Sequence, residues 1–105
     1  MNLTISARNF ELSEALNEYA KNKLSKLKRF EHVITGGHLV LEKDKSISMV
    51  ELTLLVKHST INSKVTNNDV YLGINEVTKK IERQLEKYEA KFRERKRLAA
   101  KKRQL

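Results

Sequence analysis

Residues 69–92 read DVYLGINEVTKKIERQLEKYEAKF and predict a long amphipathic helix. Successive side chains on an α-helix are about 100° apart, so residues three and four positions apart share one face. The apolar residues follow this spacing and form one narrow stripe: Val70, Ile74, Val77, Ile81, Leu85, Tyr88 and Phe92. We therefore expect the helix to pack this stripe against the rest of the domain.

The charged residues of the same helix are sorted by sign on either side of the stripe. The bases on one flank are Lys80, Arg83, Lys87 and Lys91, and the acids on the other are Glu82, Glu86 and Glu89. Like charges at this spacing are mildly destabilising without a partner, so the basic row indicates a surface for a polyanion. The alternative is that the lysines only keep the helix soluble. The acids could hold a cation, but a solvated face that pairs with Arg93 is the favoured interpretation.

Composition limits the class of protein. A chain of 105 residues fits one domain, and 22 lysines and arginines against 13 acids give a net charge of +9. Such a balance favours nucleic acid or an anionic membrane surface as the partner. Residues 1–68 carry 10 bases and 7 acids, whereas residues 69–105 carry 12 bases and 6 acids. Most of the positive excess therefore lies in the last part of the chain.

Several function classes lack a signature in this sequence. The chain has no cysteine for disulfides or thiolate metal sites, and no apolar segment long enough for a signal peptide or a membrane span. His32, His38 and His58 are scattered and follow no metal-ligand or nucleophile–base spacing. We expect a cytoplasmic protein that is not an enzyme and that has no metal, cofactor, membrane partner or small-molecule substrate.

The first part of the chain predicts a strand and a second amphipathic helix. Residues 1–8 alternate apolar and polar side chains, and Ser13 is a suitable N-cap for a helix that continues to Phe30. The apolar residues of this helix again follow helical spacing: Leu16, Tyr19, Ala20, Leu24, Leu27 and Phe30. Three bases, Lys23, Lys26 and Arg29, recur every three residues along one side.

Three more strands are expected, over residues 38–43, 47–58 and 61–66, with a polar turn over residues 42–46. Gly36-Gly37 indicates a turn before them, and Asn67-Asn68-Asp69 supplies a turn and a cap for the long helix.

The resulting β-α-β-β-β-α order predicts an α+β fold. It is a two-layer sandwich with a four-stranded sheet and both helices on one face. The last three strands form an antiparallel meander, and a crossover lays the first strand parallel to a neighbour. We expect one domain over residues 1–92. Residues 93–105, with seven bases and one acid between Arg93 and Arg103, are expected to be a basic helix extension or a disordered tail.

The aromatic residues do not predict a surface that recognises RNA bases. Tyr88 and Phe92 belong to the apolar stripe, whereas Tyr71 lies off its centre and is compatible with either packing or stacking. Without an exposed aromatic pair, RNA would be recognised by its backbone and shape, with strong salt dependence.

Particular residues resemble those of a known family. Leu12-Ser13-Glu14-Ala15-Leu16, the series Lys23, Lys26, Arg29-Phe30, and Asp69-Val70-Tyr71 with Ile74, Lys80, Arg83-Gln84-Leu85 and Lys87 resemble the ribosome hibernation-promoting factor family. That family includes the ribosome-associated translation inhibitor, also described as a sigma-54 modulation protein. The likeness covers roughly residues 1–92. Asn75, where an acid is common, and the extra base Lys79 depart from the pattern.

The resemblance implies a fold similar to a double-stranded-RNA-binding domain, in the short form of the family. It implies binding to rRNA of the small ribosomal subunit, in the mRNA and tRNA channel, and inhibition of translation under stress or in stationary phase. Matching rRNA-contacting positions are Lys23, Lys26, Arg29, Lys80, Arg83 and Lys87, and Lys91 extends the set. The free protein is expected to be monomeric. A general double-stranded-RNA-binding module and a scaffold that meets an acidic protein are the alternatives.

Overall fold

The computed structural model describes the backbone of residues 1–103 and the side chains of residues 1–91 and 93. The elements follow one another as β1 (Leu3–Arg8), α1 (Glu14–Ser25), the 3-10 helix η1 (Lys26–Phe30), β2 (Ile34–Asp44), β3 (Ile47–Val56), β4 (Ser59–Asn67) and α2 (Val70–Arg103). The predicted order is confirmed, with one refinement: the last turn of the first helix is a separate 3-10 segment.

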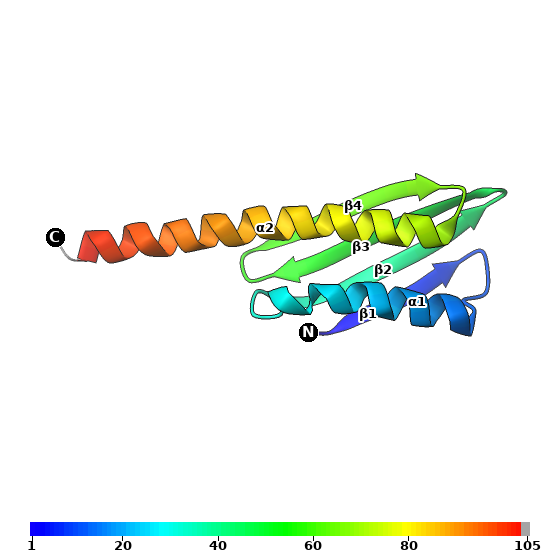
Figure 1. Cartoon of the computed structure of the whole chain (residues 1–105), viewed down its shortest axis with the longest axis horizontal. Helices are drawn as coiled ribbons and strands as arrows, with labels where there is room; N and C mark the ends of the chain where they lie inside the picture. The colour runs from blue at the N-terminus through cyan, green and yellow to red at the C-terminus, as the bar shows by residue number, and fades with distance from the viewer. Residues whose placement is uncertain (104–105) are drawn as a thin grey trace.

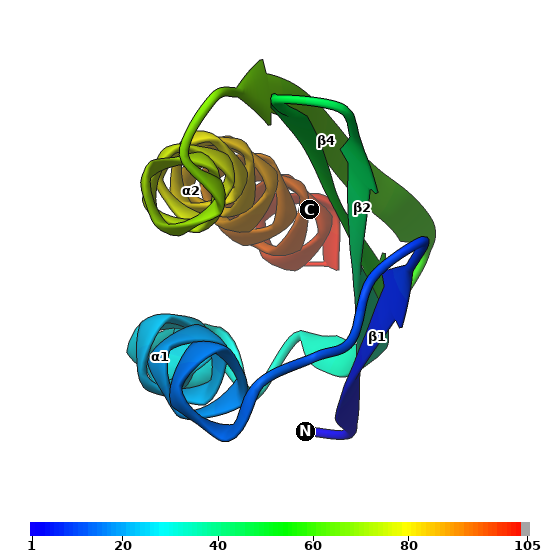
Figure 2. The same cartoon turned by 90° about the vertical axis from the view of Figure 1, so that its right-hand side faces the viewer.

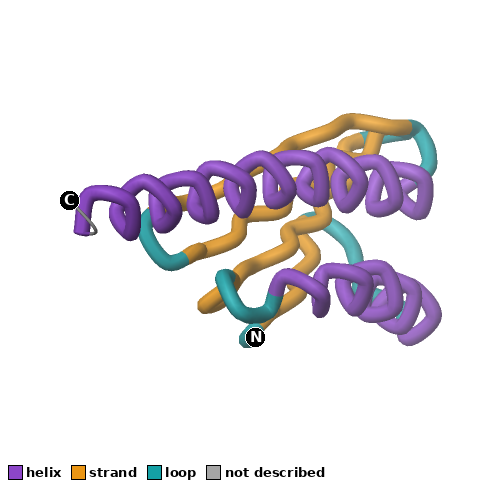
Figure 3. The backbone as a smooth tube through the Cα atoms, turned by 60° about the vertical axis from the view of Figure 1, so that its left-hand side comes forward, coloured by secondary structure: helices purple, strands orange, loops and turns teal. Residues whose placement is uncertain are grey.

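The four strands form one sheet in the order β1-β2-β3-β4 (Figure 1). β1 pairs with β2 in parallel, and β2, β3 and β4 pair in antiparallel fashion, as predicted. Figure 2, viewed along the helices, shows α1 and α2 side by side on the same face of the sheet. Figure 3 shows the same two layers from another side. The α+β two-layer sandwich is therefore confirmed.

The core lies between the two layers and is built from the predicted periodic positions. On α2, Val70, Ile74, Val77, Ile81 and Leu85 are buried. Tyr88 is half-buried and packs against this core, and the side chain of Phe92 lies outside the described residues. Alternate strand residues and the apolar stripe of α1 and η1 also contribute to it. They are Val50, Leu52, Leu54 and Val56 of β3, Ile34, Leu39 and Leu41 of β2, Ile61 and Val65 of β4, Val33 just before β2, and Leu16, Ala20, Leu24, Leu27 and Phe30.

Both predicted helix starts are capped by side chains. The Ser13 hydroxyl accepts a hydrogen bond from the backbone N–H of Leu16 at 3.1 Å. Before α2, the Asp69 carboxylate accepts from the N–H of Tyr71, and the Asn67 side chain accepts from the N–H of Asp69, both at 2.9 Å. These bonds satisfy N–H groups that have no partner within the first turn.

The interpretation of Gly36-Gly37 as a turn is wrong. Both glycines lie within β2, which begins at Ile34 rather than at His38. β1 and β3 flank β2 so closely at Gly37 that a Cβ there would overlap both neighbours. The hairpin turn that follows is shorter than predicted, because β2 continues to Asp44 and β3 begins at Ile47. Lys45 adopts a positive φ of 58° in this turn.

The C-terminal part of α2 projects past the end of the sheet (Figure 1). The helix continues to Arg103, and the molecule measures 61 × 20 × 17 Å. The division of the chain near residue 92 into a domain and a basic extension stays a prediction, and residues 104–105 of that segment lie outside the described residues. None of the helices, as far as the chain is described, is long and apolar enough to cross a membrane.

Candidate nucleic-acid interface

The most uniform charged surface is the basic flank of α2, formed by Lys80, Arg83, Lys87 and Lys91. All four side chains are exposed. They are three or four residues apart and extend over about 16 Å of the helix axis. None of the four makes a salt bridge within the described side chains. Their charge is therefore available to an external anion.

The basic flank lies on the β4 side of α2. Gln84, which lies next to it on the helix, donates from Nε2 to the backbone oxygen of Asn62 on β4 at 3.1 Å. Lys87 and Lys91 border an open cavity of about 220 Å³ between α2 and β4 that Ile61 also lines. The two lysines thus stand at the rim of a shallow groove along the helix.

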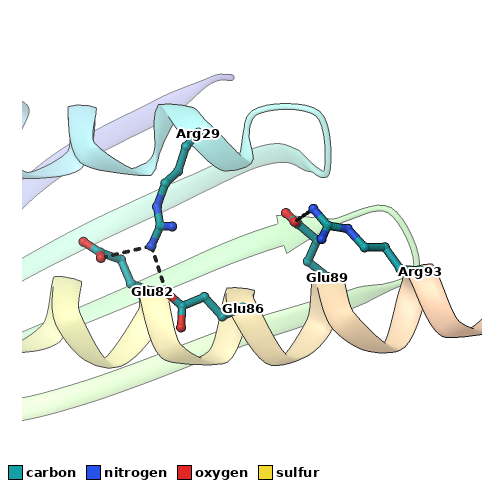
Figure 4. Close-up of polar contacts among 5 residues, drawn as sticks. All are labelled: Arg29, Glu82, Glu86, Glu89 and Arg93. Carbon is teal, nitrogen blue, oxygen red and sulfur yellow. Dashed lines mark hydrogen bonds and ion pairs between the residues drawn. The ribbon is translucent and has the colours of Figure 1, made fainter.

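The acidic flank of α2 faces η1 and the loop that follows it. Arg29 of η1 donates from Nη2 to Glu86 at 2.9 Å and to Glu82 at 3.5 Å (Figure 4). Glu89 pairs with His32 at 3.3 Å and with Arg93 (Figure 4). The predicted pairing with Arg93 is found at Glu89, whereas Glu82 and Glu86 serve a contact between helices.

The carboxylates of α2 stabilise the charged form of Arg29. Its hydrogen bond with Glu86 is the largest contribution and raises the pKa of the guanidinium above its usual range. An arginine is charged at physiological pH in any case, so the rise does not alter its protonation state. Because the group is exposed, water and salt screen the attraction, so its main effect is to orient Arg29 across the seam between η1 and α2.

The structure divides the seven predicted rRNA-binding residues into two groups. The first group is the basic flank of α2, which faces away from α1 or directly into solvent. It consists of Lys80, Arg83, Lys87 and Lys91. Arg29 lies on the α2 side of the first helical segment, with two carboxylates of α2 against it. Lys23 and Lys26 share that side by helical spacing. Among the described side chains, an acidic strip formed by Glu82, Glu86 and Glu89 therefore lies between Arg29 and the basic flank.

Lys23 leads to a feature that the sequence interpretation missed. Its Nζ lies 5.5 Å above the ring of Tyr19, and this ring meets Tyr71 of α2 with centroids 4.9 Å apart and planes at 72°. Tyr71 is 38% exposed, whereas Tyr19 is half-buried and packs against the core. Tyr71 lies off the centre of its apolar stripe. That was the available signal, but only the packing of α1 beside α2 brings the two tyrosines together.

Fold and surface together define a class of protein: a two-layer α+β domain that presents an unpaired basic helix flank. Residues 3–93 match the family described as "Sigma 54 modulation protein / S30EA ribosomal protein", and the chain belongs to this family. The predicted family membership is confirmed.

Named relatives cover most of the chain. A Haemophilus influenzae protein named "Ribosome-associated factor Y" is 31% identical over 91 residues, which are 87% of this chain and 85% of that protein. The Bacillus subtilis "Ribosome hibernation promotion factor" is 35% identical over 95 residues, but these span only 50% of that protein. A solved structure described as a ribosomal subunit interface protein from Coxiella burnetii has a TM-score of 0.80 at 27% identity. The match covers 86% of this chain and 99% of that one.

Proposed function

We propose that this protein is a ribosome hibernation factor of the bacterial cytoplasm. It binds rRNA of the small ribosomal subunit in the channel used by mRNA and tRNA, and so inhibits translation under stress or in stationary phase. Family membership and the names of the relatives support a ribosomal partner. The proposal assigns no catalysis and no cofactor to the chain.

The observation that carries the proposal is the unpaired basic flank of α2. RNA phosphates are surrounded by condensed cations, and lysine or arginine side chains that replace those cations release them into solution. This release favours binding. A helix holds Lys80, Arg83, Lys87 and Lys91 at fixed spacing, so the flank fits a regular row of phosphates better than a flexible tail of equal charge would.

The three predicted residues of the first helix, Lys23, Lys26 and Arg29, are expected to contribute less to RNA binding than the basic flank. Lys23 and Lys26 contact RNA from the first helix, on the other side of the acidic strip. Arg29 already has Glu82 and Glu86 as partners, so an RNA phosphate must compete with two carboxylates for it. We therefore expect Arg29 to contribute less to affinity than any residue of the basic flank.

Charge reversal of the basic flank tests the proposal. The variant Lys80→Glu, Arg83→Glu, Lys87→Glu and Lys91→Glu should fold, because all four side chains are exposed, and should no longer sediment with small ribosomal subunits. It should also lose inhibition of translation in vitro. The matched control reverses four exposed lysines elsewhere, Lys28, Lys45, Lys57 and Lys64, with the same change in net charge. The proposal fails if the flank variant still sediments with ribosomes, or if the control loses binding equally.

A general double-stranded-RNA-binding activity is the second candidate. The uniform charge of the basic flank favours it, since phosphate contacts carry no sequence information. Competition separates the two functions. A protein bound in the channel is displaced by tRNA and mRNA but not by bulk duplex RNA, whereas a general binder is displaced by duplex RNA at comparable concentrations.

A further inference from the structure

The aromatic contact between the two helices leaves ring surface uncovered. Tyr19 lies on α1 and Tyr71 in the first turn of α2, and their planes meet at 72°. In an edge-to-face contact only one ring face of the pair is covered by the partner. Lys23 lies over a face of Tyr19, so Tyr71 keeps at least one face that neither Tyr19 nor Lys23 covers. Tyr71 as a whole residue is 38% exposed.

Tyr71 lies near one cationic side chain, Lys23 of α1, and near the carboxylate of Asp69, which caps the helix. Leu72, the next residue on α2, is 56% exposed. The positive charge of Lys23 is held near the rings by its contact with Tyr19. The position of Tyr71 is fixed from two directions, because α1 supplies Tyr19 and the Asp69 carboxylate accepts a hydrogen bond from its backbone N–H.

We propose that Tyr71, with Tyr19 and Lys23, is a stacking site for an unpaired nucleobase. The base lies against the free face of Tyr71, and the Lys23 ammonium attracts the phosphate of the same nucleotide. Every base offers a π-face to an aromatic ring, so the site accepts a single-stranded or bulged nucleotide without choosing its sequence. The inference rests on the proposed function, because that function supplies the RNA.

The stacking site complements the basic flank. Tyr71 precedes Lys80 by nine residues, which corresponds to about 14 Å along the helix axis. The flank binds backbone phosphates and cannot tell paired from unpaired RNA. A base-stacking site at the start of α2 adds that distinction, since only an unpaired base exposes its face.

Three labelled RNA hairpins of one sequence test the site: one with a single unpaired adenosine, one with an abasic residue in its place, and one fully paired. Fluorescence anisotropy at fixed salt measures their affinities. Stacking on one aromatic side chain corresponds to about a 5- to 150-fold preference for the base-bearing RNA over the abasic RNA. Tyr71→Leu should remove this preference, and Tyr71→Phe, which keeps the ring, should retain it. Lys23→Gln should weaken binding to all three hairpins.

A second measurement needs no variant. The protein contains three tyrosines and no tryptophan, so its fluorescence reports on tyrosine alone. The base-bearing hairpin should quench it more than the abasic hairpin does. Equal affinity of the wild-type protein for these two hairpins, or a full preference in Tyr71→Leu, overturns the stacking site. Absence of small-subunit sedimentation by the wild-type protein would instead overturn the proposed function, so the two failures are distinguishable.

Discussion

Gly37 lies where three strands meet, paired with Leu3 of β1 on one side and with Leu54 of β3 on the other. A Cβ at this position would lie 2.6 Å from Leu54 Cδ2, 2.8 Å from Leu3 Cδ2 and 2.9 Å from the backbone oxygen of Thr53. The two methyl groups can rotate away, but the Thr53 oxygen belongs to the sheet backbone. Glycine is therefore required here by close strand packing and not by a turn.

The substitution Gly37→Ala is expected to destabilise the domain by about 1–3 kcal/mol, because the extra methyl group overpacks a site with no room. Urea unfolding, followed by circular dichroism, measures this. Gly36→Ala is the matched control, since its Cβ would meet only the Asn2 backbone oxygen at 3.4 Å. Equal stability of the two variants would show that the sheet adjusts at Gly37 without cost.

At the scale of elements, the seam between η1 and α2 decides how much positive charge the first helix offers. Arg29 bonds with Glu82 and Glu86 and is charged, as arginine is at any physiological pH. Its charge is therefore partly cancelled by the two acids and not by deprotonation. Freeing Arg29 requires a change in its partners.

The double variant Glu82→Gln, Glu86→Gln is expected to bind small ribosomal subunits more tightly than wild type. Both side chains keep their size, and two negative charges leave the strip between the basic groups. The free energy of unfolding should fall by less than about 1 kcal/mol, because exposed ion pairs contribute little. Binding is measured by sedimentation at several protein concentrations.

The control for this variant is Glu14→Gln, Glu18→Gln on the exposed side of α1, which changes the net charge equally. If both double variants tighten binding to the same degree, overall charge explains the effect and the position of the acids does not. A selective gain in the Glu82, Glu86 variant supports the role of the strip.

These elements also show how much the sequence could predict. The helices and three of the strands follow from local periodicity, because a buried face repeats every 3.6 or every two residues whatever lies opposite. The extra residues of β2 could not be predicted, since Gly37 reflects crowding by Leu3 and Leu54, which are distant in sequence. The basic flank could be predicted, because it is a pattern on one helix. Two contacts could not be predicted from the sequence, because they depend on how the helices pack: Arg29 with Glu82 and Glu86, and Tyr19 with Tyr71.

At the scale of the whole molecule, the core lies between the sheet and the helices, and the charged side chains of the basic flank lie on the outer surface. The sheet and the apolar stripes hold α2 in place, and the basic flank faces outward on it. A polyanion bound to such a surface is held chiefly by released counterions. The affinity should then fall as the salt concentration rises, and the steepness of this fall should report the number of phosphate contacts.

We expect the logarithm of the affinity for small ribosomal subunits to fall linearly with the logarithm of the KCl concentration at constant Mg²⁺. Each neutralised phosphate contributes about 0.7–0.9 to the slope, so four contacts from the basic flank give a slope of about −3 to −4. Lys87→Ala should reduce the magnitude of the slope by about 0.7–0.9, the contribution of one phosphate contact. Arg29→Ala should change it less, because Glu82 and Glu86 already occupy that guanidinium. Lys45→Ala on the hairpin turn is the control and should leave the slope unchanged. If all three variants shift the slope equally, the partner senses only the total charge of the molecule, and the basic flank has no special part in binding.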